Sequence, residues 1–485
     1  MNKQLPERAL LDHLKGQAKK LLNSLRSNDP AALARVGTTQ ASYRLADAQR
    51  ILAREYGFPS WTKLKQHVQE FPDRKAAFFH ALKAGERDVV QILLDFDPSL
   101  IHSHFDGAFG AAPITVAAER DDIPLIELLL DRGADINARS TWWAGGFGAL
   151  DTANEATSMY LISRGAKLSA HSAARLGLVD ELKEILRLNP DVVRERGGDG
   201  QYPLHFSKTP EIVDLLVDAG SELDARDLDH VSTAAQFRIL EIDVCRRLVE
   251  RGATPDVYVA TMLEDIPLLE RLIDADPECL ARCATEPGNP MIPNAPGMPI
   301  YTYTIGGGRL FQIAEKFGKS SALQVIERRS SPALKLMSAC WRGDVLVAKE
   351  LASHLTELTN KDFTILPEAA WERKLDAVQV MLNIGFPPDC VGVHLSSAID
   401  RAAFHGFDDI IEAILPYGPS LAILNEFGGT PLRACLRGSR DSWRKDGDFV
   451  RSVELLLEAG SPRPEKGNGS PSVNAVLERY GIETG

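Results

Sequence analysis

The sequence is poor in cysteine and has no long apolar run, and each absence narrows the class of protein. Six cysteines in 485 residues do not make a disulfide framework. The close pair Cys279 and Cys283 has no further ligand at zinc spacing, so we expect buried thiols and no metal site. No apolar run approaches the roughly 18–20 residues that span a bilayer, and the N-terminus lacks the apolar core of a signal peptide. We expect a cytoplasmic protein that does not bind membranes.

Positive charge is scarce over most of the chain. The formal net charge is −12, and residues 1–70 carry a net +6 whereas residues 71–485 carry −18. Because clustered Lys and Arg supply most of the affinity for nucleic acid, this acidic main body predicts no nucleic-acid partner. The basic head fits a solvated helical face better than a site for an anionic partner.

Recognised catalytic and cofactor motifs are also absent. The sequence has no Gly-x-Ser-x-Gly turn, no His-Glu-x-x-His zinc helix and no phosphate loop of the Gly-x-x-x-x-Gly-Lys type. Gly306-Gly-Gly-Arg309 opens a helical stretch and could receive an anion, but without a partner lysine it better fits a sharp re-entry into a helix. We therefore expect no cofactor.

The sequence is rich in helical periodicity. In residues 5–70 apolar residues recur at three- and four-residue steps, Gly57 ends one predicted helix and Ser60 caps the next. From Arg74 onward a unit of two helices recurs with a period near 33 residues. Glycine ends the second helix of most units, at Gly133, Gly165, Gly220, Gly252, Gly385, Gly418 and Gly460.

A short motif opens the first helix of several units. Tyr202-Pro-Leu-His-Phe206 and Thr430-Pro-Leu-Arg-Ala434 closely resemble the Thr-Pro-Leu-His-x-Ala motif of ankyrin repeats, and Ala112-Pro-Ile-Thr-Val-Ala117 does so more loosely. The chain resembles this family over residues 74–465, in about twelve units. The stretch Ala53-Arg-Glu-Tyr-Gly-Phe-Pro-Ser-Trp61 resembles the helical segment often found ahead of such repeats in bacterial proteins.

The resemblance implies an all-α fold, an ankyrin-repeat solenoid of helix-turn-helix units with β-turn or finger loops and an N-terminal helical cap. We predict the cap at 1–72, a first array at 73–283, an insertion rich in Pro, Gly and aromatic residues at 284–308, and a second array with a C-terminal capping helix at 309–485. The insertion is either a functional loop or a hinge between the arrays.

In ankyrin-repeat proteins the loops and first helices form a concave surface that binds partners. The loops here are rich in glycine and in aromatic residues, which are frequent binding anchors. The segment Trp142–Gly148 is repeated in no other unit; alternatively, Trp142 and Trp143 pack on the next loop and stiffen a β-finger. The predicted binding residues are Trp142, Trp143, Phe147, His104, Asp106, Tyr202, His230, Tyr301 and Tyr303.

Carboxylates near the same loops allow a different interpretation. Two carboxylates in an aromatic groove can hydrolyse a glycosidic bond, one as the acid and the other as nucleophile or base. Aspartate is also common in loops because it suits turn geometry. The weak catalytic candidates are Asp151, Asp199, Asp227 and Asp229.

The sequence therefore predicts a binding module that engages a protein or peptide partner through its concave loop surface, and not an enzyme. One alternative is an enzyme such as a glycoside hydrolase, acting on a small-molecule or carbohydrate ligand. A passive scaffold is the other.

Overall fold

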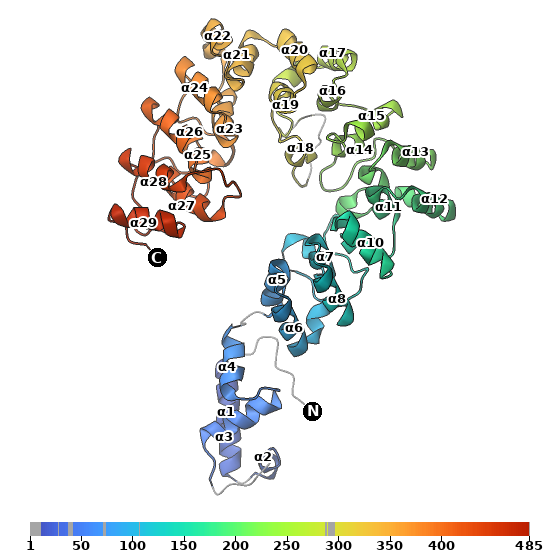
Figure 1. The fold of residues 1–485 in the computed structure, drawn as a ribbon, viewed down its shortest axis with the longest axis vertical. Helices are drawn as coiled ribbons and strands as arrows, with labels where there is room; N and C mark the ends of the chain where they lie inside the picture. Colours follow the sequence, from blue (N-terminus) through green and yellow to red (C-terminus); the bar gives the residue numbers. More distant parts are fainter. Residues whose placement is uncertain are drawn as a thin grey trace. The chain divides into compact units, whose positions relative to one another are not determined.

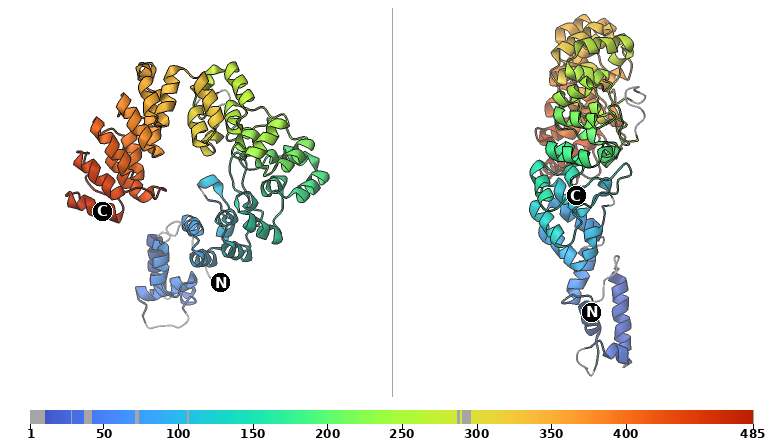
Figure 2. Two further views of the ribbon diagram at one scale, coloured as in Figure 1. Left: turned by 45° about the horizontal axis from the view of Figure 1, so that its top comes forward. Right: turned by 90° about the vertical axis from the view of Figure 1, so that its right-hand side faces the viewer.

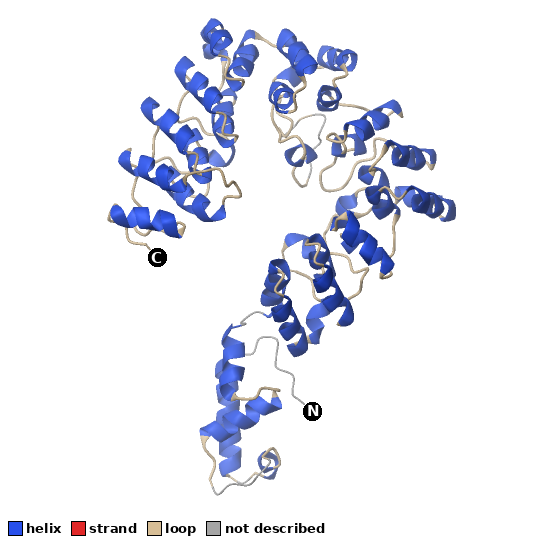
Figure 3. Cartoon of the chain, viewed as in Figure 1, coloured by secondary structure: helices blue, strands red, loops and turns tan. Residues whose placement is uncertain are grey.

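The computed structural model describes residues 11–27, 29–36, 42–70, 74–105, 107–286, 289 and 296–484. Within these ranges the chain forms α-helices and short 3₁₀ helices, and its β-bridges are isolated pairs (Figures 1 and 3). None of the helices described is long and apolar enough to cross a membrane. The predicted all-α fold is confirmed. Contacts divide the chain into two compact units, residues 1–230 and 231–485; the sequence-based domain boundaries stay a prediction.

Unit 1 consists of an N-terminal helical block followed by pairs of short helices. Its α-helices are α1 (Leu11–Arg26), α2 (Pro30–Leu33), α3 (Leu45–Glu55), α4 (Trp61–Glu70), α5 (Arg74–Ala84), α6 (Arg87–Phe96), α7 (Pro113–Glu119), α8 (Ile123–Asp131), α9 (Ala149–Thr152), α10 (Glu155–Ser163), α11 (Ala170–Leu176), α12 (Val179–Leu188) and α13 (Pro210–Asp218). Its 3₁₀ helices are η1 (Pro98–His102), η2 (Ala108–Gly110), η3 (Pro190–Arg194), η4 (Gly198–Gly200) and η5 (Pro203–Phe206).

The N-terminal block packs on the first helix pair through aromatic contacts. Leu14, Leu52 and Leu64 form a buried cluster against which Phe96 of α6 packs. The Phe58 and Phe96 ring centroids lie 5.2 Å apart. The block therefore covers apolar surface that the first repeat leaves without a preceding neighbour, as terminal caps of solenoids do.

Unit 2 continues the pattern of helix pairs. Its α-helices are α14 (Ala234–Phe237), α15 (Ile242–Glu250), α16 (Val257–Leu263), α17 (Ile266–Ala275), α18 (Ile300–Tyr303), α19 (Leu310–Lys316), α20 (Ser320–Arg329), α21 (Pro332–Trp341), α22 (Val345–Glu350), α23 (Ile365–Trp371), α24 (Leu375–Ile384), α25 (Ala398–His405), α26 (Asp408–Ile414), α27 (Pro431–Asp441), α28 (Phe449–Glu458) and α29 (Pro471–Arg479). Its 3₁₀ helices are η6 (Pro277–Leu280), η7 (Ala352–Glu357), η8 (Asp362–Thr364), η9 (Val393–Leu395) and η10 (Leu415–Tyr417).

The helices from α23 to α28 stack in two rows. The first helices α23, α25 and α27 contact one another in succession, and the second helices α24, α26 and α28 do the same. These are the orange and red pairs of Figure 2. One continuous apolar core runs from Phe237 to Ile482 through both rows, and α29 closes it against α28. Each pair therefore buries its apolar face on its neighbours, as a solenoid requires.

Small residues set the close spacing of the first row. Ala402 and Ala403 of α25 are fully buried. A Cβ at position 438 of α27 would lie 1.9 Å from the Phe404 carbonyl oxygen, so only glycine fits there. Because α25 and α27 approach this closely, the side chains that flank their contact project together on the surface.

Candidate functional site

The segment Arg139–Gly148 forms the tip of a two-stranded finger in unit 1. Arg139 and Gly148 make an isolated antiparallel bridge. The Ser140 amide donates to the Phe147 carbonyl at 2.8 Å, and the Phe147 amide donates to Ser140 Oγ at 2.9 Å. The finger is therefore held by one main-chain hydrogen bond and one hydrogen bond to the Ser140 side chain.

Aromatic rings join this finger to the loops on either side. Phe109, in the preceding loop, makes edge contacts with Trp142 at 4.7 Å and with Phe147 at 5.9 Å. Phe147 also packs on Gly198 of the next loop, where a Cβ would lie 2.3 Å from the ring. Trp142 and Phe147 are thus half-buried between neighbouring loops. Trp143 and Phe109 present more than half of their surface to solvent, 59% and 51%.

Two further predicted binding residues make contacts between or within loops. His104 Nε2 lies 3.1 Å from the Arg139 carbonyl oxygen, which ties its loop to the finger. The Arg196 guanidinium lies over the Tyr202 ring, 4.4 Å from its centroid. Asp106 lies outside the described residues.

The two tyrosines of the insertion have opposite environments. Tyr301, predicted on a loop surface, is fully buried in α18, where its ring packs 5.2 Å from Tyr258 and its hydroxyl donates to Asp256 Oδ2 at 2.6 Å. Burial and the adjacent Asp256 raise the pKa of Tyr301 well above its usual value. Tyr303 is 64% exposed. Of this pair, Tyr303 is the residue that is exposed to solvent.

Two of the candidate catalytic carboxylates make structural hydrogen bonds. Asp151 accepts from the Gly148 amide at 2.8 Å and from Arg139 Nη2 at 3.1 Å, which caps α9 and fastens the finger. Asp227 accepts from the His230 amide at 2.7 Å within the loop. Both carboxylates therefore help to shape the loops they lie in.

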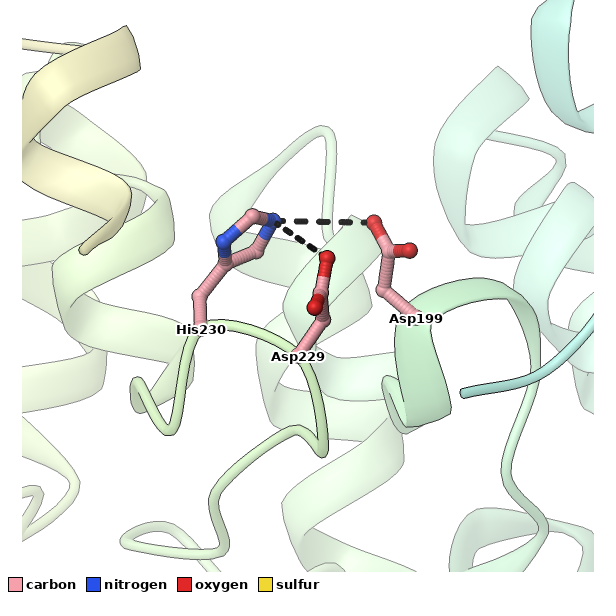
Figure 4. A group of neighbouring side chains, drawn as sticks. All are labelled: Asp199, Asp229 and His230. Atoms are coloured by element: carbon pink, nitrogen blue, oxygen red, sulfur yellow. Dashed lines mark ion pairs between the residues drawn. The ribbon is translucent and has the colours of Figure 1, made fainter. Parts of the chain in front are cut away.

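The other two candidates, Asp199 and Asp229, lie beside His230 (Figure 4). His230 Nε2 is 3.6 Å from Asp199 Oδ2 and 3.9 Å from Asp229 Oδ2. All three residues are at most 9% exposed. Burial raises the pKa of Asp229; the nearby Asp199 charge adds to this and His230 opposes it. Three residues predicted from separate positions thus converge in one cluster.

A groove that the sequence did not indicate lies along α23, α25 and α27 of unit 2. Its volume is about 840 Å³. Its walls also include the loops after α24, α26 and α28. The residues that define this arginine groove are Trp371, His394, Asp400, Arg401, Phe404, Asn425, Phe427, Arg433, Arg437, Arg440, Trp443, Glu465 and Lys466.

Cationic side chains dominate the arginine groove. Arg433, Arg437 and Arg440 follow one face of α27 at helical spacing, and all three are exposed. Among the described residues Arg437 pairs with Asp441, whereas Arg433 and Arg440 have no ion pair. The groove holds five Lys or Arg side chains and two carboxylates in a chain of net charge −12. It is therefore a local positive site on an acidic protein.

Aromatic rings form the apolar part of the groove. Trp371 stacks near Phe404 at 6.1 Å and contacts Trp443 edge-on at 5.6 Å. The Arg401 guanidinium lies 4.9 Å from the Trp371 centroid, and burial lowers its pKa. Trp443 and Phe427 remain 64% and 65% exposed. The groove thus combines free cations with accessible aromatic surface.

A second groove of about 800 Å³ adjoins the first in unit 2. The two share Trp371, Val393 and Arg401, so one surface continues from α27 past α23 to the Gly306–Gly308 turn. The second groove is more mixed in charge: Lys361 pairs with Glu286 and Lys374 with Glu315. Its cations are therefore less available than Arg433 and Arg440.

One stretch of the chain matches a known family. A family model described as ankyrin repeat matches residues 109–141. The chain is 30% identical to Ankyrin repeat and SAM domain-containing protein 6 of Rattus norvegicus over 162 residues, which are 30% of this chain and 18% of that protein. It is 25% identical to Alpha-latrotoxin-Lhe1a of Latrodectus hesperus over 154 residues, 31% of this chain and 9% of the toxin. The chain thus spans less than a fifth of either relative.

Solved structures give distant likenesses. The human ASB11 ankyrin repeat domain matches with a TM-score of 0.26 and 14% identity over 61% of this chain and 100% of that one. One chain of the complex between the predatory endopeptidase Bd0816 of Bdellovibrio bacteriovorus and the immunity protein Bd3460 matches with a TM-score of 0.25 and 20% identity, over 36% of this chain and 97% of that one.

Proposed function

Because this chain is an ankyrin-repeat protein, we propose that it is a protein-binding module, and that its arginine groove binds an acidic segment of a partner protein. Solenoid repeats present extended surfaces to partners. Because cationic side chains dominate this groove, a partner segment must supply negative charge. The observation that carries the proposal is the row of Arg433, Arg437 and Arg440 along an aromatic groove.

Charge complementarity selects the partner. The acidic body of this chain repels acidic ligands at long range, so an acidic segment gains from contact only where cations are concentrated. The guanidinium N–H groups of Arg433 and Arg440 can bind a partner, because neither residue forms an ion pair with a carboxylate among the described residues. Guanidinium groups bind carboxylates in a bidentate geometry that fixes orientation as well as charge.

Aromatic residues supply the second requirement of a binding site. Trp443 and Phe427 are exposed beside the arginines. Tryptophan and arginine are enriched among residues that dominate binding energy. The partner segment is therefore expected to alternate Asp or Glu with at least one large apolar side chain.

The aromatic finger of unit 1 is a second proposed contact surface. Phe109 and Trp143 are its exposed rings, with Trp142 and Phe147 packed behind them. Two exposed rings that both contact Trp142 can anchor a partner independently of the arginine groove. Replacing Trp143 by Ala tests this surface alone, because its ring is not wedged between loops as that of Phe147 is.

The hydrolase alternative has less support. Asp151, Asp199, Asp227 and Asp229 belong to unit 1 and line neither groove described above. Asp151 and Asp227 already serve in loop hydrogen bonds. Incubation with a panel of glycosides, using Asp199→Asn as a control, tests this alternative: turnover that the variant loses would favour the enzyme.

An array of short peptides tests the arginine groove directly. The peptides vary in Asp and Glu content and carry one Trp, Phe or Leu, and matched Lys peptides serve as a reference. We expect the full chain to bind acidic members and the Arg433→Ala/Arg440→Ala variant to bind them at least about tenfold more weakly, since desolvated charge pairs contribute more than about 1.4 kcal/mol.

The control for this variant removes the same charge elsewhere. Arg187 on α12 and Arg328 on α20 are 67% and 61% exposed and lie outside the groove. An Arg187→Ala/Arg328→Ala variant should bind as the parent does. Equal weakening by both double variants would show that binding follows net charge and not the groove.

A further inference from the structure

The cluster of Asp199, Asp229 and His230 has the spacing of ligands around a shared ion. A hydrogen bond from an imidazole to a carboxylate spans about 2.7–3.0 Å, so the separations of 3.6 and 3.9 Å between His230 Nε2 and the two carboxylates are too long for one. Ligands that each lie about 2.0–2.2 Å from a tetrahedral ion are about 3.4 Å apart. The observed separations are close to that value, and one ligand atom from each residue lies within 4.8 Å of the others.

A second observation concerns the buried Asp199 side chain. Its Oδ1 atom is buried and has no hydrogen-bond partner among the described residues. The residue as a whole is 9% exposed. A buried carboxylate oxygen without a donor is costly, because ionised groups lose their hydration without replacement. The other oxygen of this carboxylate, Oδ2, faces His230 (Figure 4), so a cation bound to Oδ2 would compensate the charge of the buried side chain.

The main chain holds the three side chains in place. Asp199 lies in η4, while Asp229 and His230 lie in the loop thirty residues later. The Asp199 carbonyl accepts from the Leu228 amide at 2.9 Å and from the Asp229 amide at 3.3 Å. Asp227 fixes the His230 amide at 2.7 Å. The two loops are therefore joined before any ion binds, which reduces the entropy cost of binding.

We propose that Asp199, Asp229 and His230 bind a divalent first-row transition ion of the Zn²⁺ class, and that this ion clasps the loop at 198–200 to the loop at 227–230. Imidazole with two carboxylates suits such ions, whereas Mg²⁺ and Ca²⁺ take oxygen ligands. Water or the second oxygen of Asp199 completes the coordination. The site is distinct from the arginine groove, and the sequence had predicted no metal.

Zinc titration of the full chain, stripped with a chelator and followed by calorimetry, tests the proposal. We expect one ion per chain and no comparable binding of Mg²⁺ or Ca²⁺. His230→Gln and Asp199→Asn should each weaken binding by more than about tenfold, since even the loss of outer partners of metal ligands costs about 10–100-fold. Asn tolerates the left-handed conformation of Asp199, whose φ is +54°, so this variant keeps the loop.

His354→Gln is the matched control. His354 lies 2.7 Å from Glu357 in an exposed pair, outside the cluster. This variant should bind zinc as the parent does. Circular dichroism in the absence of metal confirms that the variants are folded.

Two further readouts separate this site from other ligands. Cobalt substitution should give visible bands of nitrogen and oxygen coordination without a thiolate charge-transfer band, which excludes the six cysteines. Affinity should fall on acidification, because protons compete with the ion for its ligands. Absent binding, or binding unchanged in His230→Gln, would overturn the proposal and leave the cluster as an ion pair.

Discussion

Replacing Tyr301 by Phe removes one hydroxyl from the core of unit 2 and should destabilise it measurably. The hydroxyl donates to Asp256 Oδ2 at 2.6 Å, and Asp256 is 4% exposed. The same carboxylate accepts from the Gln236 amide side chain at 2.9 Å and from the main-chain amides of Tyr258 and Val259 at 3.0 and 2.9 Å. The variant therefore leaves a buried carboxylate short of one of these donors.

The magnitude follows from the charge on the acceptor. A hydrogen bond to a buried charged group contributes about 1.5–3 kcal/mol, so we expect a loss of about 2 kcal/mol. With a urea m-value of about 2–3 kcal/mol/M, the midpoint of the transition that unfolds α14–α18 falls by about 0.7–1 M. Urea unfolding combined with hydrogen exchange of α16 amides measures it.

Tyr303→Phe provides the matched control from the same short helix. Tyr303 is 64% exposed, so removing its hydroxyl should change stability by less than about 0.5 kcal/mol. Equal effects of the two substitutions would refute the buried Tyr301–Asp256 contact. So would loss of partner binding by Tyr301→Phe with unchanged stability, because it would make Tyr301 a binding residue.

Two further predictions concern packing and pH. Gly438→Ala should destabilise the protein by about 1–3 kcal/mol and weaken binding in the groove, because the new Cβ would lie 1.9 Å from the Phe404 carbonyl oxygen. The control is Gly16→Ala, where a Cβ would have nothing within 4 Å, so this substitution should be neutral or stabilise the protein by up to about 1 kcal/mol. Thermal melts of the two variants measure the difference. Burial, with help from nearby Arg444, lowers the pKa of His405 to about 4. As the pH falls, the unfolded chain binds a proton at His405 before the folded chain does. His405 therefore leaves the free energy of unfolding unchanged above pH 6.5 and lowers it by up to about 3 kcal/mol as the pH falls to 4. Urea midpoints measured from pH 7 to 4 should therefore fall less in His405→Gln; equal slopes would contradict this.

Local signals in the sequence predicted the fold well. The motif at Thr430-Pro431 starts α27 as expected, with Thr430 Oγ1 accepting from the Arg433 amide at 3.4 Å. Gly385 ends α24 in the left-handed conformation, with φ of +105°. Such signals act within a few residues, so they can be interpreted without knowledge of tertiary contacts.

Environments set by distant contacts could not be predicted. Tyr301 lies in a segment rich in Pro and Gly, which indicates an exposed loop, yet its burial depends on Asp256 and Tyr258 more than forty residues earlier. Likewise the convergence of Asp199 with His230 depends on how two loops stack. The periodicity of a sequence indicates which face of a helix a residue lies on. It does not indicate which other helix or loop that residue contacts.

The arginine groove is an intermediate case. The spacing of Arg433, Arg437 and Arg440 was visible in the sequence and places them on one helix face. An exposed cationic face is usually solvated, so the spacing alone indicated no site. What distinguishes it is the contact of α25 with α27, which brings Trp371, Phe404 and Trp443 beside that face.

A double-mutant cycle between the groove and an acidic peptide tests the central claim most directly. Each Asp or Glu of the bound peptide is replaced by its amide in turn and measured against Arg433→Ala, Arg440→Ala and the control Arg187→Ala. If the groove binds the peptide, at least one acidic position couples to Arg433 or Arg440 by more than about 1 kcal/mol and none couples to Arg187. Coupling energies near zero at every position would contradict the assignment of the groove.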